Sequence, residues 1–165
     1  MQKRTSQAIA TITCCAALTA GTASAAHAAT PQAPTASSPR AATATPAALP
    51  SGTATATSFW DGVTASGKPM RYQTIASPYW PLGTTVKITY GGRSAVGVVE
   101  DFGPAEWAVA QHDIPAIVDL SEEMMAGLTG VRSNSVHIRF QVLSWGTGRV
   151  FRSAGTGYDL AMGRG

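Results

Sequence analysis

Two aspartates are the residues of this sequence best suited to chemistry. Asp101 follows Val98, Val99 and Glu100 at the end of a predicted strand, and Asp119 follows the apolar pair 117–118. A carboxyl group at the end of a strand can be held rigidly beside a substrate. Partial burial, or a nearby negative charge, raises the pKa of such a group above its usual ~3.9 and lets it act as an acid. Each aspartate also has a structural interpretation: Asp119 leads into a predicted helix, and Asp101 precedes a Gly-Pro turn.

Other catalytic groups are scarce. Cys14 and Cys15 lie inside the predicted export signal, so we expect the mature protein to contain neither a thiol nucleophile nor a disulfide. His112 and His137 do not have the spacing of metal ligands. His137 also falls on the outward side of a predicted strand, which favours a solvated surface residue. We therefore expect no metal site and no cofactor.

Residues 1–28 have the three parts of a secretory signal peptide. Lys3 and Arg4 precede an apolar run at 8–20, and small residues suited to cleavage follow it. That run is shorter than the ~20 residues that cross a bilayer as a helix. We therefore expect a protein without a membrane span that is secreted and either extracellular or associated with the cell wall.

The mature chain divides by composition into three parts. Residues 29–51 are rich in Ala, Thr, Pro and Ser, which predicts a disordered tether. Residues 52–145 form the predicted domain, which is large enough for one core, and we expect it to be monomeric. Residues 146–165 are a Gly-rich tail to which the sequence assigns no structure.

The charge of the domain argues against nucleic acid as a partner. The chain has 12 Lys and Arg against 9 Asp and Glu. Because Lys3, Arg4 and Arg40 precede the domain, the remaining basic and acidic residues cancel. A chain that is neutral from residue 51 onward lacks the basic surface that phosphate binding requires.

The elements that must position the aspartates are six strands and one short helix. The helix is predicted to begin at Ser121, a good N-terminal cap, and to end before Gly130. The last strand is the clearest, because apolar and polar residues alternate along it. The predicted strands are Thr53–Phe59, Thr74–Ala76, Thr84–Tyr90, Ser94–Glu100, Ala116–Asp119 and Ser135–Leu143.

A series of short sequence blocks adds a family resemblance to this pattern. The chain from Gly52 to Leu143 resembles the double-psi β-barrel of the rare lipoprotein A (RlpA-like) family, which is related to expansins and to the three-aspartate domain of membrane-bound lytic transglycosylase A. The resemblance implies a mainly β fold, a six-stranded double-psi β-barrel with one short helix. The matching blocks, in order, are Gly52–Thr55, Thr64–Gly67, Thr74–Ala76, Pro81–Thr84, Gly92–Ser94, Glu100–Pro104 and Val118–Ser121.

The resemblance also implies a function on cell-wall polysaccharide such as peptidoglycan. In the related lytic transglycosylases, an aspartate protonates the glycosidic oxygen and then takes a proton from the 6-hydroxyl of the sugar, which leaves a 1,6-anhydro product. By position Asp101 matches that aspartate, and Asp119 matches a second aspartate shared with expansins. Thr57 lies where expansins have a groove threonine, and Ser77 stands at a site position of the family, so both are expected to contact sugar hydroxyls.

The sequence departs from the family at several of these positions. Ser77 replaces a histidine that accompanies the catalytic aspartate, Lys68 replaces a glutamate, and Phe102 replaces an arginine. The segment 105–116 between the two aspartates is also longer than is typical. These departures weaken the expectation of catalysis more than the expectation of the fold.

Three functions remain open at this point. The first is a lytic transglycosylase that uses Asp101 and Asp119. The second is an expansin-like module that binds or loosens the wall without cleaving it, using flat aromatic rings against sugars. The third is a secreted barrel that binds a protein, such as a protease inhibitor, for which no specific motif is present. The rings considered for the second function are Trp60, Tyr79, Trp80 and Trp107, with Phe59 beside them.

Overall fold

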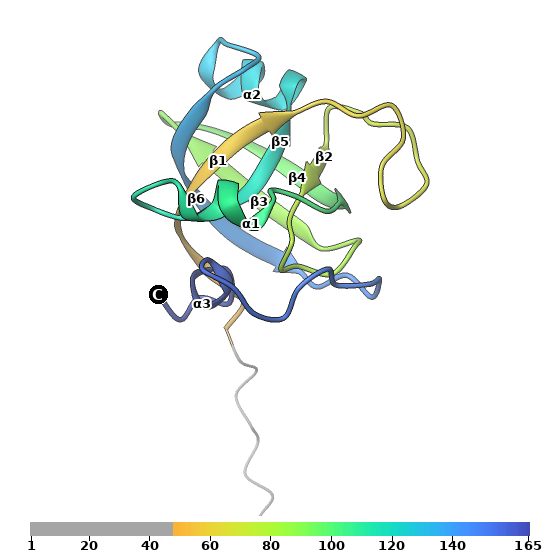
Figure 1. The fold of residues 1–165 in the computed structure, drawn as a ribbon. Coiled ribbons are helices and arrows are strands. Elements are labelled where there is room, and N and C mark those ends of the chain that lie inside the picture. Colours follow the sequence, from red (N-terminus) through yellow and green to blue (C-terminus); the bar gives the residue numbers. More distant parts are fainter. Residues whose placement is uncertain (1–47) are drawn as a thin grey trace, which may run out of the picture. The chain divides into compact units, whose positions relative to one another are not determined.

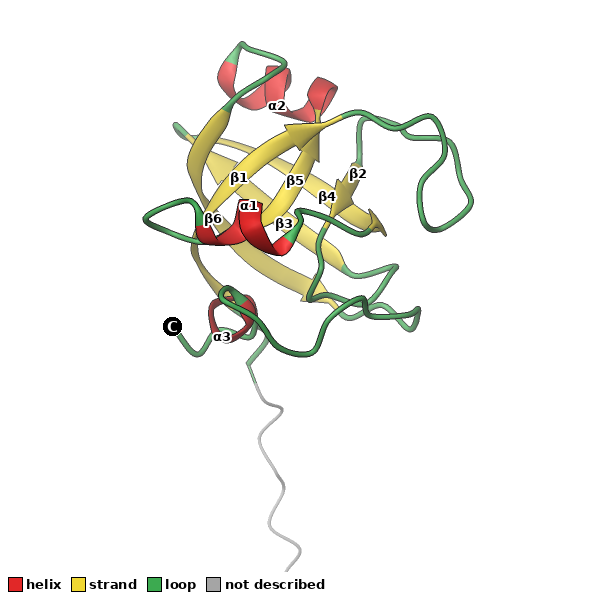
Figure 2. Cartoon of the chain, in the orientation of Figure 1, coloured by secondary structure: helices red, strands yellow, loops and turns green. Residues whose placement is uncertain are grey.

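The computed structural model describes residues 48–165. The predicted signal peptide and nearly all of the predicted tether lie outside the described residues. Within 48–165, no helix is long and apolar enough to span a membrane. The elements, shown in Figures 1 and 2, are β1 (Ser51–Phe59), β2 (Thr74–Ala76), β3 (Thr85–Tyr90), β4 (Arg93–Asp101), α1 (Glu106–Ala110), β5 (Ala116–Ser121), α2 (Glu122–Thr129), β6 (Ser135–Ser144) and α3 (Tyr158–Ala161).

The six strands close into a barrel in the order β1-β5-β2-β4-β3-β6. β1 pairs in parallel with β5 and antiparallel with β6, while β4 pairs in parallel with β2 and antiparallel with β3. Exchanging the first three strands with the last three therefore reproduces the same set of pairings. This interlocked arrangement, with its closed sheet and no free edge, confirms the expected fold class, a mainly β six-stranded double-psi barrel.

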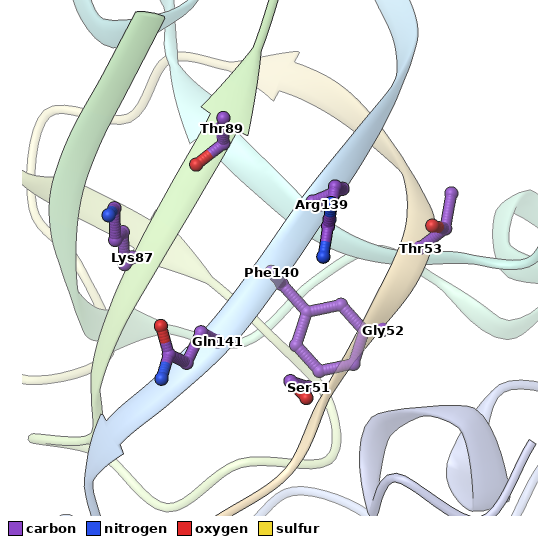
Figure 3. Close-up of a pocket in the computed structure, with 8 residues that line it drawn as sticks. All are labelled: Ser51, Gly52, Thr53, Lys87, Thr89, Arg139, Phe140 and Gln141. Atoms are coloured by element: carbon purple, nitrogen blue, oxygen red, sulfur yellow. The ribbon is translucent and has the colours of Figure 1, made fainter. Parts of the chain in front are cut away.

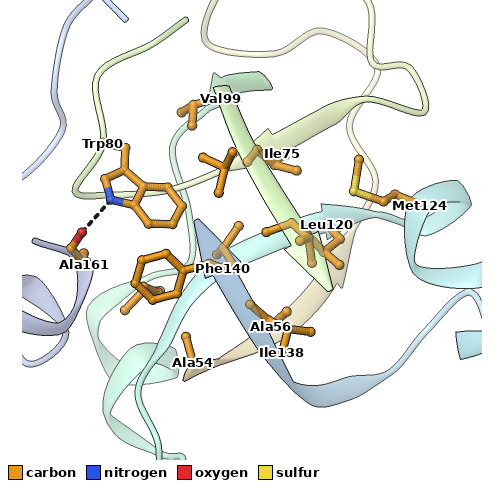
Figure 4. Packing of buried hydrophobic residues seen from close by; sticks show 14 of the residues in the cluster. Ala54, Ala56, Ile75, Trp80, Val99, Leu120, Met124, Ile138, Phe140 and Ala161 are labelled. Carbon is orange, nitrogen blue, oxygen red and sulfur yellow. Dashed lines mark hydrogen bonds between the residues drawn. The ribbon is translucent and has the colours of Figure 1, made fainter. Parts of the chain in front are cut away.

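The barrel is filled by the inward-facing residues of the strands (Figure 4). In β6, Ile138, Phe140 and Val142 are buried while the residues between them are exposed, as the alternation predicts. Gly97 in β4 lets a neighbouring strand approach closely, because a Cβ there would lie 2.6 Å from a side-chain carbon of Ile75.

The predicted helix is confirmed as α2. The Oγ of Ser121 accepts a hydrogen bond from the backbone N–H of Met124 at 3.1 Å, which caps the helix. Gly130 ends it with a φ of 88°, a conformation that favours glycine. The structure contains two further helices, α1 and α3, that the sequence does not predict; they are only 5 and 4 residues long, too short to show a clear periodicity.

The tail, residues 146–165, packs against the barrel and ends in α3. The indole N–H of the buried Trp80 donates to the backbone carbonyl of Ala161 at 2.9 Å (Figure 4). Gly146 lies so close to Leu82 that a Cβ would be 2.2 Å from the Leu82 carbonyl oxygen. The tail glycines therefore permit close backbone approach, a tertiary reason that local sequence patterns do not reveal.

Candidate functional site

The two aspartates flank the same residue of the barrel. Asp119 in β5 is in register with Thr57 of β1 on one side and with Ala76 of β2 on the other. Asp101, the last residue of β4, is in register with Ala76 from the opposite side of β2. The sheet thus brings together two carboxyl groups that are separated in the chain by a loop and a helix.

Asp119 is a partly buried carboxyl group with one strong local donor. The hydroxyl of Thr57 donates a short hydrogen bond to Oδ1 of Asp119. Burial raises the pKa of Asp119 to about 6; the Thr57 hydrogen bond opposes the rise, and the negative charge of Asp101 adds to it. Asp119 therefore keeps its proton up to a pH of about 6, as a general acid in a mildly acidic environment must.

Asp101 is oriented by backbone groups. Its Oδ1 accepts the N–H of Phe102 at 2.7 Å and the N–H of Ala65 at 3.1 Å. The second bond ties the loop after β1 to the end of β4. Asp101 therefore lies fixed at the margin of the site, where its charge acts on Asp119.

Gly103 allows the loop after β4 to lie against Asp119. A Cβ at Gly103 would be 2.8 Å from Oδ2 of Asp119, closer than a methyl group can approach without displacing the carboxyl. The glycine of the Gly-Pro turn thus has a specific steric role: it leaves room for the second oxygen of Asp119.

Three predicted contact residues are corrected by the structure. The ring of Trp80 is fully buried, and Tyr79 is 1% exposed, so neither ring offers a face to a sugar. Ser77 is also buried, and its hydroxyl donates to the carbonyl of Ile117 at 2.9 Å instead of facing a ligand. The physical reason is shared: the segment after β2 turns inward under the tail, which covers it.

Two predicted aromatic residues lie at the surface instead. Trp60 is 74% exposed and comes three residues after Thr57 in the chain. Trp107, on α1, is 73% exposed and comes four residues after Gly103. Both indole rings are therefore open to solvent and free to meet a ligand.

A buried carboxylate next to the site was not among the predicted residues. Glu100 is 2% exposed and accepts hydrogen bonds from Arg71 at 2.5 Å and from the hydroxyl of Thr74 at 2.7 Å, with Lys68 at 3.8 Å. Burial raises the pKa of Glu100, but the hydrogen bonds and the two positive charges outweigh it, so the pKa is lowered overall. Lys68 thus serves as a counter-charge to Glu100.

Glu106 of α1 was also missed, and it joins the loop between the aspartates to the tail. Its carboxylate accepts the N–H and the hydroxyl of Thr156, both at 2.8 Å, and a guanidinium N–H of Arg152 at 2.9 Å. The phenol of Tyr79 donates to it at 3.3 Å. The Thr156 bonds come first among the causes that lower the pKa of Glu106. In the sequence, the one indication of this role is that Glu106 lies in the long segment 105–116.

Two cavities of the described residues lie apart from the aspartates. One, of about 600 Å³, is on the outer face of β1, β3 and β6 (Figure 3). Another, of about 310 Å³, lies between the tail and the segment after β2. Within residues 48–165, no three His, Cys, Asp or Glu side chains gather in a way that could hold a metal ion. The residues of the larger cavity are Ser51, Gly52, Thr53, Lys87, Thr89, Arg139, Phe140 and Gln141.

Comparison with known proteins gives matches in structure but none in sequence. No protein-family model matches the chain, and no curated protein matches it. The Streptomyces papain inhibitor is similar at a TM-score of 0.46 and 23% identity, over 59% of this chain and 98% of that one. Cerato-platanin 2 from M. perniciosa is similar at a TM-score of 0.42 and 12% identity, over 56% of this chain and 95% of that one.

Proposed function

We propose that this chain is an exported protein that acts on cell-wall glycan and cleaves it as a lytic transglycosylase, with Asp119 as the acid and base. The observation that carries the proposal is the partly buried Asp119 carboxyl, held by Thr57, with a pKa of about 6. A proton donor of this pKa suits protonation of a glycosidic oxygen in a mildly acidic environment.

In this mechanism the carboxyl of Asp119 gives its proton to the glycosidic oxygen as the bond from that oxygen to C1 breaks. The carboxylate then takes the proton of the 6-hydroxyl, whose oxygen bonds to C1. The products are a free sugar hydroxyl and a 1,6-anhydro end, and Asp119 regains its proton without a water molecule being consumed. The fixed negative charge of Asp101 stabilises the positive charge that develops at C1.

The division of labour differs from the one that the family resemblance implies. By sequence position Asp101 is the acid, whereas the electrostatics favour Asp119, because it is Asp119 that has the raised pKa. Asp101 accepts two backbone N–H groups, which fix the position of its carboxylate. In this proposal the exposed rings of Trp60 and Trp107 stack on sugar rings of the substrate.

The test is digestion of purified sacculi with the chain isolated after export, followed by mass spectrometry for anhydro-muropeptides. We expect release by the wild type at pH 5, with a decline as the pH rises through about 6 because Asp119 loses its proton. Asp119→Asn abolishes release, and Asp101→Asn reduces it. Release by Asp119→Asn at the wild-type rate contradicts the assignment of the acid.

A second function, wall binding without cleavage, is favoured by one observation. Trp60 and Trp107 are 74% and 73% exposed, so each offers a ring face on which a sugar can stack without any bond being cleaved. In the same experiment, a wild type that pellets with sacculi but releases no anhydro product identifies a binding module. In that case Trp60→Ala and Trp107→Ala each weaken pelleting, whereas Asp119→Asn leaves it unchanged.

A further inference from the structure

The larger of the two cavities, of about 600 Å³, lies on the outer face of β1, β6 and β3 (Figure 3). Neither Asp101 nor Asp119 lines it. Its volume falls within the range of about 300–1,000 Å³ that is typical of small-molecule sites. The cavity is therefore a candidate binding site separate from the aspartates. The polar side chains that line it are Ser51, Thr53, Lys87, Thr89, Arg139 and Gln141.

The strand register places these side chains in two rows across the three strands. In the first row, Arg139 of β6 is in register with Thr53 of β1 on one side and with Thr89 of β3 on the other, as Figure 3 shows. Neighbouring strands are about 4.8 Å apart, so the three side chains lie side by side. Thr89 is already hydrogen-bonded to Ser94 at 2.9 Å, which leaves the Thr53 hydroxyl as a donor beside Arg139.

The second row lies two residues further along β6. Here Gln141 is in register with Ser51 of β1 and with Lys87 of β3. Lys87 is therefore the diagonal neighbour of Arg139, and such neighbours are about 7–8 Å apart on an antiparallel pair. Lysine and arginine have long side chains, so the ammonium and the guanidinium can converge on one group that lies between them.

The cavity has two positive charges and no negative one. β1, β3 and β6 contain no Asp or Glu. Among residues 48–165, neither Lys87 nor Arg139 forms an ion pair with a carboxylate. The chain is neutral from residue 51 onward, but its charges are thus unevenly placed. Two cations are too few for a nucleic-acid backbone, yet they match the charge of one phosphate monoester, about −1.5 to −2.

We infer that this cavity binds a phosphate group that carries two negative charges, with Arg139 and Lys87 as its charged partners. The planar guanidinium can donate two parallel N–H groups to phosphate oxygens, and the ammonium supplies a compact charge. The hydroxyls of Ser51 and Thr53 and the amide of Gln141 are further donors. The volume leaves room beside the phosphate, which favours a phosphorylated small molecule over the free ion.

A phosphate suits this arrangement better than a carboxylate does. A carboxylate has one charge and two oxygens in one plane, so a single arginine can satisfy it. A tetrahedral phosphate monoester presents three oxygens in different directions. The donors of the cavity come from three neighbouring strands and belong to two cations, which matches the phosphate in both geometry and charge.

The test is a titration of the ¹⁵N-labelled chain, isolated after export, with inorganic phosphate and separately with glucose 6-phosphate, at pH 7.5 and constant ionic strength. We expect saturable shifts of the backbone amide signals of β1, β3 and β6. Lys87→Gln and Arg139→Gln each weaken binding about tenfold, since each removes a charged donor. Arg149→Gln is the matched control and binds like the wild type, because Arg149 is exposed, lies outside the cavity and forms no ion pair among residues 48–165.

The two titrations also distinguish the sources of the phosphate. Tighter binding of glucose 6-phosphate supports a phosphorylated molecule as the ligand, and equal binding supports the free ion. The inference is overturned if neither compound gives saturable shifts, if acetate gives equal shifts, or if Arg149→Gln weakens binding as much as Lys87→Gln does. The ¹⁵N spectrum of each variant shows whether the fold is retained. No wall glycan takes part, so the result is independent of the proposed function.

Discussion

Glu100 and Asp119 are two shielded carboxyl groups in one small barrel, and their surroundings shift their pKa values in opposite directions. Glu100 is buried beside Arg71 and Lys68, and its pKa is lowered. Asp119 receives only the hydroxyl of Thr57 and faces the charge of Asp101, and burial raises its pKa to about 6. Burial is the leading cause in both cases, so the available counter-charge decides the outcome.

The opposite pKa shifts distinguish a carboxylate that stabilises the fold from a carboxyl group that can transfer a proton. Glu100 remains ionised and joins β4 to Arg71 and Thr74. Asp119 holds a proton that it can transfer, which is what a general acid requires. When the pKa values of two neighbouring carboxyl groups are shifted apart, the two groups have different roles. Substituting each group by its amide tests this division of roles.

The largest expected effect is that of Glu100→Gln. The amide keeps the shape of the side chain but gives up the charged hydrogen bonds to Arg71 and Thr74, so we expect a loss of about 2 kcal/mol in the free energy of unfolding at pH 7. Urea denaturation measures it. Glu122→Gln is the control, because its ion pair with Arg132, at 3.7 Å on the surface, is expected to contribute little.

Acid should also weaken the protein through Glu100. Because its folded pKa lies below the unfolded 4.5, its stabilising contribution is present above pH 4.5 and is lost as the pH falls through the folded pKa. The Glu100→Gln variant lacks this part of the acid dependence. An unchanged acid dependence in the variant would show that the ion pair contributes nothing.

The next effect, of opposite sign, is that of Asp119→Asn. Asp119 ionises near 3.8 when unfolded and near 6 when folded, so the folded state binds more protons between these values and stability falls as the pH rises through them. Asparagine carries no such penalty. We expect the variant to be about 1 kcal/mol more stable than the wild type at pH 7.5, allowing for the part of the carboxyl in water, and equally stable at pH 3.

Denaturation curves at the two pH values measure this difference. A variant that is less stable than the wild type at pH 7.5 would show that the Asp119 carboxylate is stabilising. Asp119 and Glu100 would then both be stabilising carboxylates, and the contrast between their effects on stability would not hold.

The smallest expected effect is that of Thr57→Val. The change removes the donor to Asp119 and keeps the shape, so the pKa of Asp119 rises further and stability falls by about 0.5 kcal/mol at pH 7. In the sacculus digestion, the decline of activity moves to higher pH. Thr89→Val is the control, since Thr89 bonds only to Ser94 on the surface. A decline at an unchanged pH contradicts a direct Thr57 contribution.

The sequence predicts the barrel well because its signals are local. Strand alternation, the Ser121 cap and the terminal Gly130 are decided within a few residues, and the structure follows them. The hydrogen bond from Thr57 to Asp119 is not predicted by the sequence, although both residues are among the predicted site residues.

What the sequence does not predict depends on contacts between distant segments. The burial of Tyr79 and Trp80 results from the tail folding over them, and that tail is Gly-rich for the sake of close approach. The ion pair of Glu100 with Arg71 joins a strand to a loop nearly thirty positions away. Local propensity carries no information on such pairings. The burial of Tyr79 and Trp80 and the ion pair of Glu100 with Arg71 are therefore visible only in the structure.

The most direct test is a pH titration of the side-chain carboxyl carbons of the exported chain by ¹³C NMR, with Asp119→Asn to assign the signal. The account predicts that the Asp119 signal titrates with a midpoint of about 6. A midpoint at or below 3.8, the ordinary value of an aspartate, would mean that Asp119 is an ionised carboxylate like Glu100, and the assignment of Asp119 as the acid would be wrong.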